Sequence, residues 1–344
     1  MIFSYRTRLR LRRLLTACAV LAAISAIALV CWLIWVGRFI IYDSTDGARL
    51  DFSLGPIPLG QPAEEPVIRE PVKILYEEPE IEVEIPIEKE EEETGISGYY
   101  VDFEDLKEDI SAVKEKLSTL PKGTAVLVDV KNIKGHFHYS TGVGKCSEDV
   151  DIGLMDDLIA WLRGSGLYAI ARVPALRDWQ YGLNHVDDGL PKVGANGSLW
   201  WDEEYCYWLD PTSQGTLDYL TQVAMELRML GFDEVVFNEF RFPDTDEIVF
   251  DGDKQQALTD AAAYLVKKCA TTRFCVSFTA ADGSFVLPQG NSRLYLEDVT
   301  AAQIPDVLEQ ISFEKPELHL LFLTTVNDTR FDEYCVLRPL ENAI

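Results

Sequence analysis

The sequence has few basic residues for its length. It carries 31 Lys and Arg against 57 Asp and Glu in 344 residues, which gives a formal net charge of −26. A nucleic-acid-binding protein needs a basic face for the phosphates, so this deficit argues against a nucleic-acid partner. With 47% hydrophobic and 11% aromatic residues, the chain is also too apolar to be mostly disordered.

Metal-binding and phosphate-binding motifs are scarce as well. The chain has four His; His136 and His138 lie two apart on a predicted turn, and no further His or Cys spacing completes a ligand set. Seven Cys include no CxxC pair, and only Cys269 and Cys275 are close enough along the chain to suggest a bond, which nothing requires. No Gly-rich phosphate turn follows a predicted strand. We therefore predict neither a metal nor a cofactor.

The charge is unevenly distributed and divides the chain into three regions. Residues 1–40 carry +6, residues 41–60 carry −2, residues 61–95 carry −10, and residues 96–344 carry −20. Each region therefore needs its own physical interpretation.

Residues 14–37 form the longest uncharged apolar stretch. A helix of these 24 residues can cross the roughly 30 Å hydrocarbon layer of a bilayer. Five arginines precede the stretch and only Arg38 follows at once, so the positive-inside rule places residues 1–13 in the cytoplasm and the rest of the chain outside the cell membrane. A cleaved signal peptide is the alternative, but its apolar core would be shorter and would end in a small-x-small site, whereas this stretch ends near Trp32 and Trp35.

Residues 38–95 are acidic and rich in proline. Seven prolines fall between Pro56 and Pro86, and a glutamate-rich run ends the region at residues 88–93. Proline removes backbone donors and like charges repel, so we predict a disordered, extended stalk that holds the next domain away from the bilayer.

Residues 96–344 have the length and the element order of a (β/α)8 barrel of the TIM type. Seven strands alternate with amphipathic helices, and an eighth is weaker, so the barrel could be incomplete. The predicted strands are residues 98–103, 124–130, 168–174, 234–240, 274–279, 294–297, 318–324 and 334–337.

Polar residues follow the second, third and fourth predicted strands. Active sites of such barrels lie where strands end and the loops after them begin, so we expect these side chains to line one mouth. Asn238 and Glu239 should face opposite ways because side chains alternate along a strand. The candidate residues at these strand ends are Asp129, Lys131, Arg172, Asp178, Asn238, Glu239 and Arg241.

A 33-residue segment, residues 177–209, holds four of the seven tryptophans. Three of them, Trp179, Trp201 and Trp208, are candidate sugar-binding residues because aromatic faces stack on the CH faces of sugar rings. Alternatively, the segment is a self-packed lid whose tryptophans form its own core. Asp210 follows it and could either bind substrate or cap the next helix.

Several of these motifs resemble a known family. The family-like stretches are 128–131 with Gly135 and Tyr139, 171–173 with Asp178, residues 201–211, and above all residues 231–243. Together they are similar to a bacterial glycoside hydrolase domain of unknown function, distantly related to α-amylase-type TIM barrels, and the similarity covers roughly residues 96–300. The resemblance implies a domain that binds or cleaves a polysaccharide such as a cell-envelope glycan.

The fourth strand departs from the family pattern. Asn238 stands where the resemblance implies an aspartate, and a neutral amide cannot act as the nucleophile of a glycosidase. The remaining catalytic candidates are Glu239, Asp129 and Asp282. The alternative is a catalytically inactive barrel that binds glycans or serves as a scaffold.

Overall fold

The computed structural model describes residue 32, residues 40–43 and 47–50, and residues 95–343 except 196, 280–285 and 312–314. The chain divides into two units, Met1–Ile85 and Pro86–Ile344. Apart from Trp32, the apolar stretch at 14–37 lies outside the described residues, and among those residues no helix is long and apolar enough to cross a bilayer. The membrane helix and the domain boundaries stay predictions.

The first unit contains one short hairpin. Strand β1 (Ile40–Asp43) pairs antiparallel with β2 (Gly47–Leu50), and Ile40 lies opposite Leu50. This pair lies inside the region 38–95, where we predicted an extended stalk. Ile40, Ile41 and Tyr42 are strand-favouring residue types, whereas the prolines that argued for a stalk begin only at Pro56.

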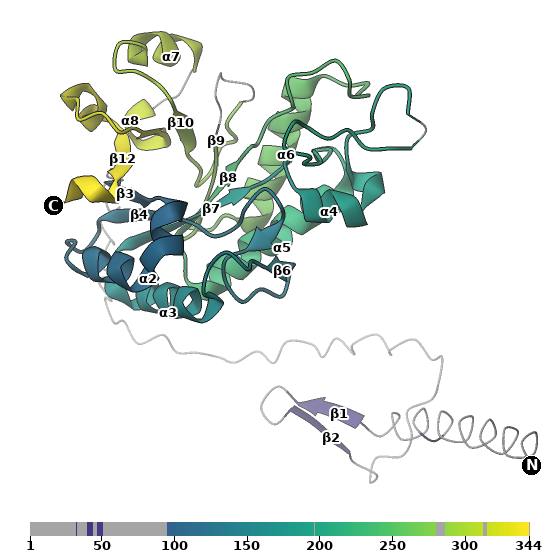
Figure 1. Cartoon of the computed structure of the whole chain (residues 1–344), viewed down its shortest axis with the longest axis horizontal. Helices are drawn as coiled ribbons and strands as arrows, with labels where there is room; N and C mark the ends of the chain where they lie inside the picture. The colour runs from purple at the N-terminus through teal and green to yellow at the C-terminus, as the bar shows by residue number, and fades with distance from the viewer. Residues whose placement is uncertain are drawn as a thin grey trace, which may run out of the picture. The chain divides into compact units, whose positions relative to one another are not determined.

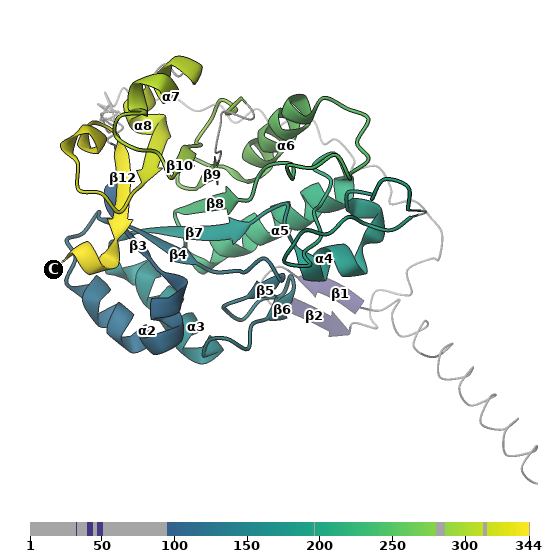
Figure 2. The same cartoon turned by 45° about the horizontal axis from the view of Figure 1, so that its top comes forward.

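The second unit is a closed barrel of eight parallel strands in the order β10-β11-β12-β3-β4-β7-β8-β9 (Figures 1 and 2). The predicted barrel is therefore confirmed, and the weak eighth strand is β12. The barrel strands are β3 (Ser97–Val101), β4 (Ala125–Asp129), β7 (Tyr168–Pro174), β8 (Glu234–Asn238), β9 (Cys275–Thr279), β10 (Leu294–Glu297), β11 (Leu320–Leu323) and β12 (Cys335–Pro339).

Helices surround the barrel, and two short strands form a small separate sheet beside it. The α-helices are α2 (Phe103–Ser118), α3 (Ile152–Ser165), α4 (Trp179–Asn184), α5 (Gln214–Leu230), α6 (Lys254–Cys269), α7 (Ile304–Gln310) and α8 (Pro316–His319). The 3-10 helices are η1 (Val186–Asp188), η2 (Thr329–Glu333) and η3 (Leu340–Ala343), and the small sheet pairs β5 (His136–Phe137) with β6 (Lys145–Cys146).

Local sequence explains where the main helices begin and end. Asp151 and Ser213 cap α3 and α5 by accepting hydrogen bonds from backbone N–H groups in the first turn. Gly166 and Gly231 end the same helices in the left-handed conformation that glycine adopts without strain. The apolar faces of the helices then pack on the outer faces of the strands.

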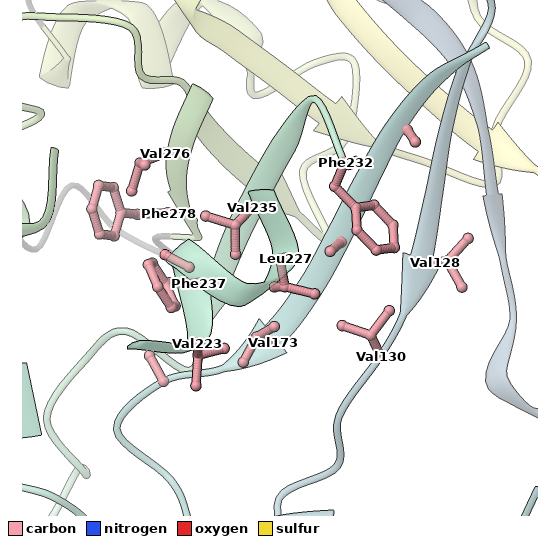
Figure 3. Close-up of a cluster of buried hydrophobic side chains, with 14 of the residues drawn as sticks. Val128, Val130, Val173, Val223, Leu227, Phe232, Val235, Phe237, Val276 and Phe278 are labelled. Atoms are coloured by element: carbon pink, nitrogen blue, oxygen red, sulfur yellow. The ribbon is translucent and has the colours of Figure 1, made fainter. Parts of the chain in front are cut away.

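The outer core lies between strands and helices. Figure 3 shows Val223 and Leu227 of α5 beside Val173, Val235 and Phe237 of β7 and β8, all of them fully buried. Removing these side chains from water supplies the main driving force for folding, at about 25 cal/mol per Å² of apolar surface.

A second, smaller core fills the barrel itself. Its members include Leu127, Ile170, Val236, Tyr295 and Leu321, one from each of five strands. Side chains alternate along a strand, so the residues two positions further on also face inward. They are Asp129, Arg172, Asn238, Glu297 and Leu323, and four of these five are polar.

A buried acid holds the opposite end of the barrel interior together. Glu234 is fully buried and forms an ion pair with Arg293 at 2.6 Å (Oε2 to Nη1). It also accepts hydrogen bonds from the hydroxyls of Tyr168, Ser277 and Tyr295 at 3.0, 2.5 and 3.0 Å. Four donors on β7, β9, β10 and the residue before β10 thus converge on one carboxylate of β8.

We expect Glu234→Ala to lower the free energy of unfolding by about 3–5 kcal/mol, because Arg293 would keep its charge in the interior without a partner. Urea unfolding followed by circular dichroism measures this loss. Glu115→Ala, on the exposed face of α2, is the control and should change stability by less than about 0.5 kcal/mol. Equal stability of the two variants would contradict a structural role for the Glu234 network.

Candidate functional site

An ion triad closes the barrel at the carboxyl ends of its strands. Asp129 and Arg172 are register partners on β4 and β7, and the guanidinium donates to both carboxylate oxygens at 2.6 and 2.9 Å. The third guanidinium nitrogen reaches Glu297 of β10 at 3.1 Å. The mouth therefore contains Asp129 and Arg172, as predicted, together with Glu297, which the sequence analysis placed in a strand but not in the site.

The backbone changes direction at the end of β8. Asn238 is the last strand residue and faces the barrel interior, whereas Glu239 has a positive φ of 51°. A left-handed backbone is uncommon for a residue with a side chain, and such strain concentrates at functional sites. Strand alternation does not extend past Asn238, so Glu239 lines the same cavity as Asn238. The Glu239 carboxylate also reaches Arg177 in the adjoining loop after β7.

Two arginines hold the Glu239 carboxylate. Arg177 Nη1 lies 3.2 Å from Oε1, and Arg241 Nη2 lies 3.0 Å from Oε2. Each oxygen of this carboxylate is therefore held by one cation, Arg177 from the loop after β7 and Arg241 from the loop after β8.

Trp208 and Asp202 support the two arginines. The guanidinium groups of Arg241 and Arg177 lie 4.8 and 5.8 Å from the centre of the Trp208 ring, and Trp208 Nε1 donates to Asp202 at 3.0 Å. Burial alone would raise the pKa of Asp202, but hydrogen bonds from Arg177, the Cys206 N–H and Trp208 outweigh it and lower that pKa. The long aromatic segment therefore positions Glu239 through the contacts of Trp208 and Asp202 with the two arginines.

Two cavities adjoin at the mouth. One of about 640 Å³ is lined by Asn238, Glu239, Arg241, Thr279, Glu297, Asp298, Val299, Gln303, Asp306, Val307 and Gln310. The other, of about 550 Å³, is lined by Tyr100, Asp102, Arg172, Glu297, Asp298, Val299, Thr300, Ala301, Ala302, Leu323, Thr324, Thr325, Val326, Asp328 and Arg330. The two share Glu297, Asp298 and Val299, so Glu297 stands on the wall between them. Both volumes fall in the usual range of small-ligand pockets.

Three further features of the mouth could not be read from the strand pattern. Asp298, directly after β10, has a positive φ of 59° and contacts both cavities. The Asn238 Oδ1 atom is buried and has no hydrogen-bond partner within the described part of the chain. Partial burial raises the pKa of Asp102, and the nearby Asp105 charge adds to the shift while Arg172 opposes it. Asn238 was a candidate from the sequence, whereas Asp102 fell inside a predicted strand and Asp298 directly followed one, and neither was singled out.

Lys131 and Asp178 lie in the loops that follow β4 and β7. They form an ion pair at 2.7 Å with both side chains fully buried. Asp178 also accepts from Tyr219 Oη at 2.8 Å and caps α4 through the Tyr181 N–H, while Lys131 donates to the Pro174 carbonyl. Neither residue lines the two mouth cavities. The structure thus joins these two candidates in a pair that fixes the loops after β4 and β7.

The aromatic segment is a folded extension rather than an open sugar platform. Trp208 is buried and packs with Leu190 and Ile248, whereas Trp201 is exposed and contacts the edge of Tyr207. Trp179 begins α4 and is half-buried. None of the three tryptophans lines either mouth cavity. The self-packed alternative therefore describes Trp208, and Trp201 remains available on the surface.

Two candidates remain, Asp210 and Asp282. Asp210 accepts hydrogen bonds from the Thr212 N–H and hydroxyl, and Ser213 is the residue that caps α5. Asp210 lines neither mouth cavity. Asp282 lies outside the described residues. In the described part of the chain, no group of three His, Cys, Asp or Glu side chains could hold a metal ion.

A family comparison bears on this geometry. The family model described as "Putative glycosyl hydrolase domain" matches residues 100–279, which is just over half of the chain. The chain belongs to this family. The match runs from β3 to the end of β9 and so includes Asp129, Arg172, Asn238 and Glu239. Glu297 and Asp298 lie beyond it. No curated protein matches the chain.

The chain is also similar, at low sequence identity, to several solved structures. A hypothetical protein from Ruminiclostridium thermocellum is 19% identical over 52% of this chain and 96% of its own, with a TM-score of 0.42. The glycoside hydrolase domain of PelA from Pseudomonas aeruginosa is 13% identical over 72% of this chain and 95% of its own (TM-score 0.40). The α-galactosidase TtGalA from Thermus thermophilus is 12% identical over 59% of this chain and 41% of its own (TM-score 0.41).

His138 is buried next to the loop that follows β4. Its ring packs edge-on against Phe103 with centroids 4.4 Å apart, and Nδ1 has no hydrogen-bond partner among the described residues. Burial lowers the pKa of His138 to about 4, although Asp129 and Asp149 oppose the shift. The folded protein therefore keeps this ring neutral where an unfolded chain would protonate it.

We expect acid to destabilise the fold through His138. Between about pH 6.5 and pH 4 the unfolded chain binds a proton that the folded chain does not, so stability is full above this window and falls as the pH falls, by about 3 kcal/mol. Urea unfolding of wild type and His138→Asn across this range measures the difference, and the fall should be smaller in the variant. Above about pH 7 the two pH dependences should coincide. If the free energy of unfolding fell equally in wild type and variant between about pH 6.5 and pH 4, His138 would not be the group responsible.

Proposed function

We propose that the barrel mouth binds a glycan and hydrolyses a glycosidic bond, with Glu239 and Glu297 as its two carboxyl groups. The observation that carries the proposal is that both residues line the same 640 Å³ cavity at the carboxyl ends of β8 and β10. Glycosidases of both stereochemical types need two carboxyl groups, about 5–10 Å apart, on either side of the scissile bond. Membership of a glycosyl hydrolase family supports the same reading.

The contacts of the two carboxylates suggest different roles. Glu239 binds two arginines and is 21% exposed, which suits a carboxylate fixed in place to attack the sugar or to stabilise positive charge on it. Glu297 binds one arginine, through one oxygen, and is 43% exposed. Its freer carboxyl group suits proton exchange with the leaving oxygen and with water. Asp129 has both oxygens bound to Arg172 and therefore orients that arginine rather than reacting.

A binding-only barrel is the second candidate. Asn238 occupies the inward position at the end of the fourth barrel strand, where the family resemblance implies an aspartate. An amide can hydrogen-bond a sugar but cannot form a glycosyl ester. In this case the mouth still binds a glycan but lacks the nucleophile that hydrolysis requires.

Variants of the full-length chain separate the two functions. We expect Glu239→Gln and Glu297→Gln each to lower glycoside hydrolysis at least about 100-fold, because each removes one member of the carboxyl pair, while glycan binding persists. Turnover is measured on a panel of chromogenic glycosides and reducing-end assays on polysaccharides, and binding on a glycan array.

Glu203→Gln is the matched control, because Glu203 is exposed in the aromatic segment and lines neither mouth cavity. It should retain wild-type turnover. If wild type binds glycans without turnover and Asn238→Asp creates hydrolysis, the binding-only reading is correct and Glu239 is not the nucleophile.

We also propose that residues 14–37 anchor the chain in the cell membrane with the barrel outside the cytoplasm. The proposal rests on the length of the apolar stretch and on the arginines that precede it. In cells, the full chain should resist alkaline extraction from membranes and its barrel should be digested by protease added outside the cytoplasmic membrane. Release of the barrel by alkali, or its protection in the cytoplasm, would contradict the proposal.

A further inference from the structure

The charges at the mouth are unequal once ion pairs are taken into account. Three described arginines line the two cavities, and each already contacts an acid: Arg172 binds Asp129 and Glu297, Arg241 binds Glu239, and Arg330 binds Asp328. An anionic ligand would therefore have to break an existing ion pair to gain a cation.

Three acids at the mouth are left over. Asp102, Asp298 and Asp306 line the cavities, and none has an ion-pair partner among the described residues. Asp306 lies in the first turn of α7 and borders the cavity of Glu239, Asp102 borders the other cavity, and Asp298 borders both. Unpaired carboxylates therefore surround Glu297 on both sides.

Asn238 adds an independent acceptor. Its buried Oδ1 has no hydrogen-bond partner in the described part of the chain, and a buried oxygen of this kind costs free energy until a donor reaches it. Asn238 also lines the 640 Å³ cavity, so rotation of its amide would turn this oxygen toward an ammonium or hydroxyl group of a ligand there. The net charge of −20 on residues 96–344 further raises the local concentration of cations near the cleft.

We propose that the ligand of this mouth is a cationic glycan, an oligosaccharide that carries free amino groups, rather than a uronate, phosphorylated or fully N-acetylated one. The proposal rests on the function proposed above and narrows its substrate class. The protonated amine of one sugar lies near Asp298 or Asp306 in the cavity of Glu239, and that of a neighbouring sugar lies near Asp102 in the adjoining cavity. Glu297 stands between the two.

Calorimetric titration of the full-length chain with three tetrasaccharides tests the ligand class. The probes are tetra-glucosamine, tetra-N-acetylglucosamine and tetragalacturonate, at about pH 6, where the free amines carry charge. We expect tetra-glucosamine to bind at least about tenfold more tightly than either of the others. Its affinity should fall as salt is raised, because the paired charges are partly exposed to solvent.

Variants at Asp306 on α7 and at Asp298, directly after β10, test two of the named residues. Asp306→Asn should weaken tetra-glucosamine binding about two- to fivefold, and Asp298→Asn should do the same without backbone strain, because asparagine tolerates a positive φ. Glu309→Gln removes the same charge from the same helix at a position that lines neither cavity and should leave affinity within twofold.

These experiments distinguish a failure of the cationic-glycan inference from a failure of the proposed hydrolase function. If the acetylated or uronate oligomer binds as tightly as the amino oligomer, or if Glu309→Gln weakens binding as much as Asp306→Asn, the cationic-glycan inference is wrong. Hydrolysis of that other oligomer, lost in Glu239→Gln, would then still establish the proposed function. If no oligomer of any charge class is bound or cleaved, the proposed function fails and this inference with it.

Discussion

The geometry of the mouth depends on the two ion pairs that Arg177 and Arg241 form with the Glu239 carboxylate. Glu239 directly follows β8 and has a left-handed backbone, which is strained for a residue other than glycine. Arg177, in the loop after β7, contacts one of its carboxylate oxygens, and Arg241, in the loop after β8, contacts the other. Strain of this kind costs about 1–3 kcal/mol and persists only when surrounding contacts compensate for it. The ion pairs and the buried Trp208 between the arginines provide those contacts. The aromatic segment thus holds Glu239 in place through Arg177 and Trp208.

Charges are balanced in pairs inside the barrel but not at the rim of its mouth. Burying a charge without a partner is expensive, so each arginine near the barrel axis is matched by an acid on a neighbouring strand or loop. Asp129 on β4 pairs with Arg172 on β7 in this way. Lys131 and Asp178 form a second buried pair in the loops after the same two strands. The acids at the exposed rim face water and need no partner, which leaves the rim negative. The unpaired charges that a ligand can neutralise therefore lie at the rim and not in the interior.

The barrel could be predicted because its signals are local. Strand β7 was predicted with its exact ends, Tyr168 and Pro174, since a run of apolar residues between glycine-rich and loop-forming segments marks a buried parallel strand. The same reasoning located Asp129, Arg172 and Asn238 at strand ends, and the structure brings all three to one mouth. Alternation along a regular strand was enough to place them.

The parts that could not be predicted depend on irregular backbone or on distant pairing. Glutamate has no preference for a positive φ, so nothing in the sequence indicated the left-handed backbone at Glu239. Glu297 ends a short strand in the weakest part of the pattern, and only closure of the barrel brings it to Arg172 across 125 residues. Lys131 and Asp178 looked like mouth residues because they follow strand ends, yet loop geometry buries both. Hydrophobic periodicity carries no information on any of these.

A crystal structure of the full chain with a non-hydrolysed oligosaccharide bound tests the central claim most directly. The account predicts a sugar ring in the cavity lined by Asn238, with the Glu239 and Glu297 carboxyl groups on either side of one glycosidic oxygen, about 5–10 Å apart. A sugar bound only on the exposed face of Trp201, or a Glu239 side chain that points toward the helices and away from Arg177 and Arg241, would contradict it.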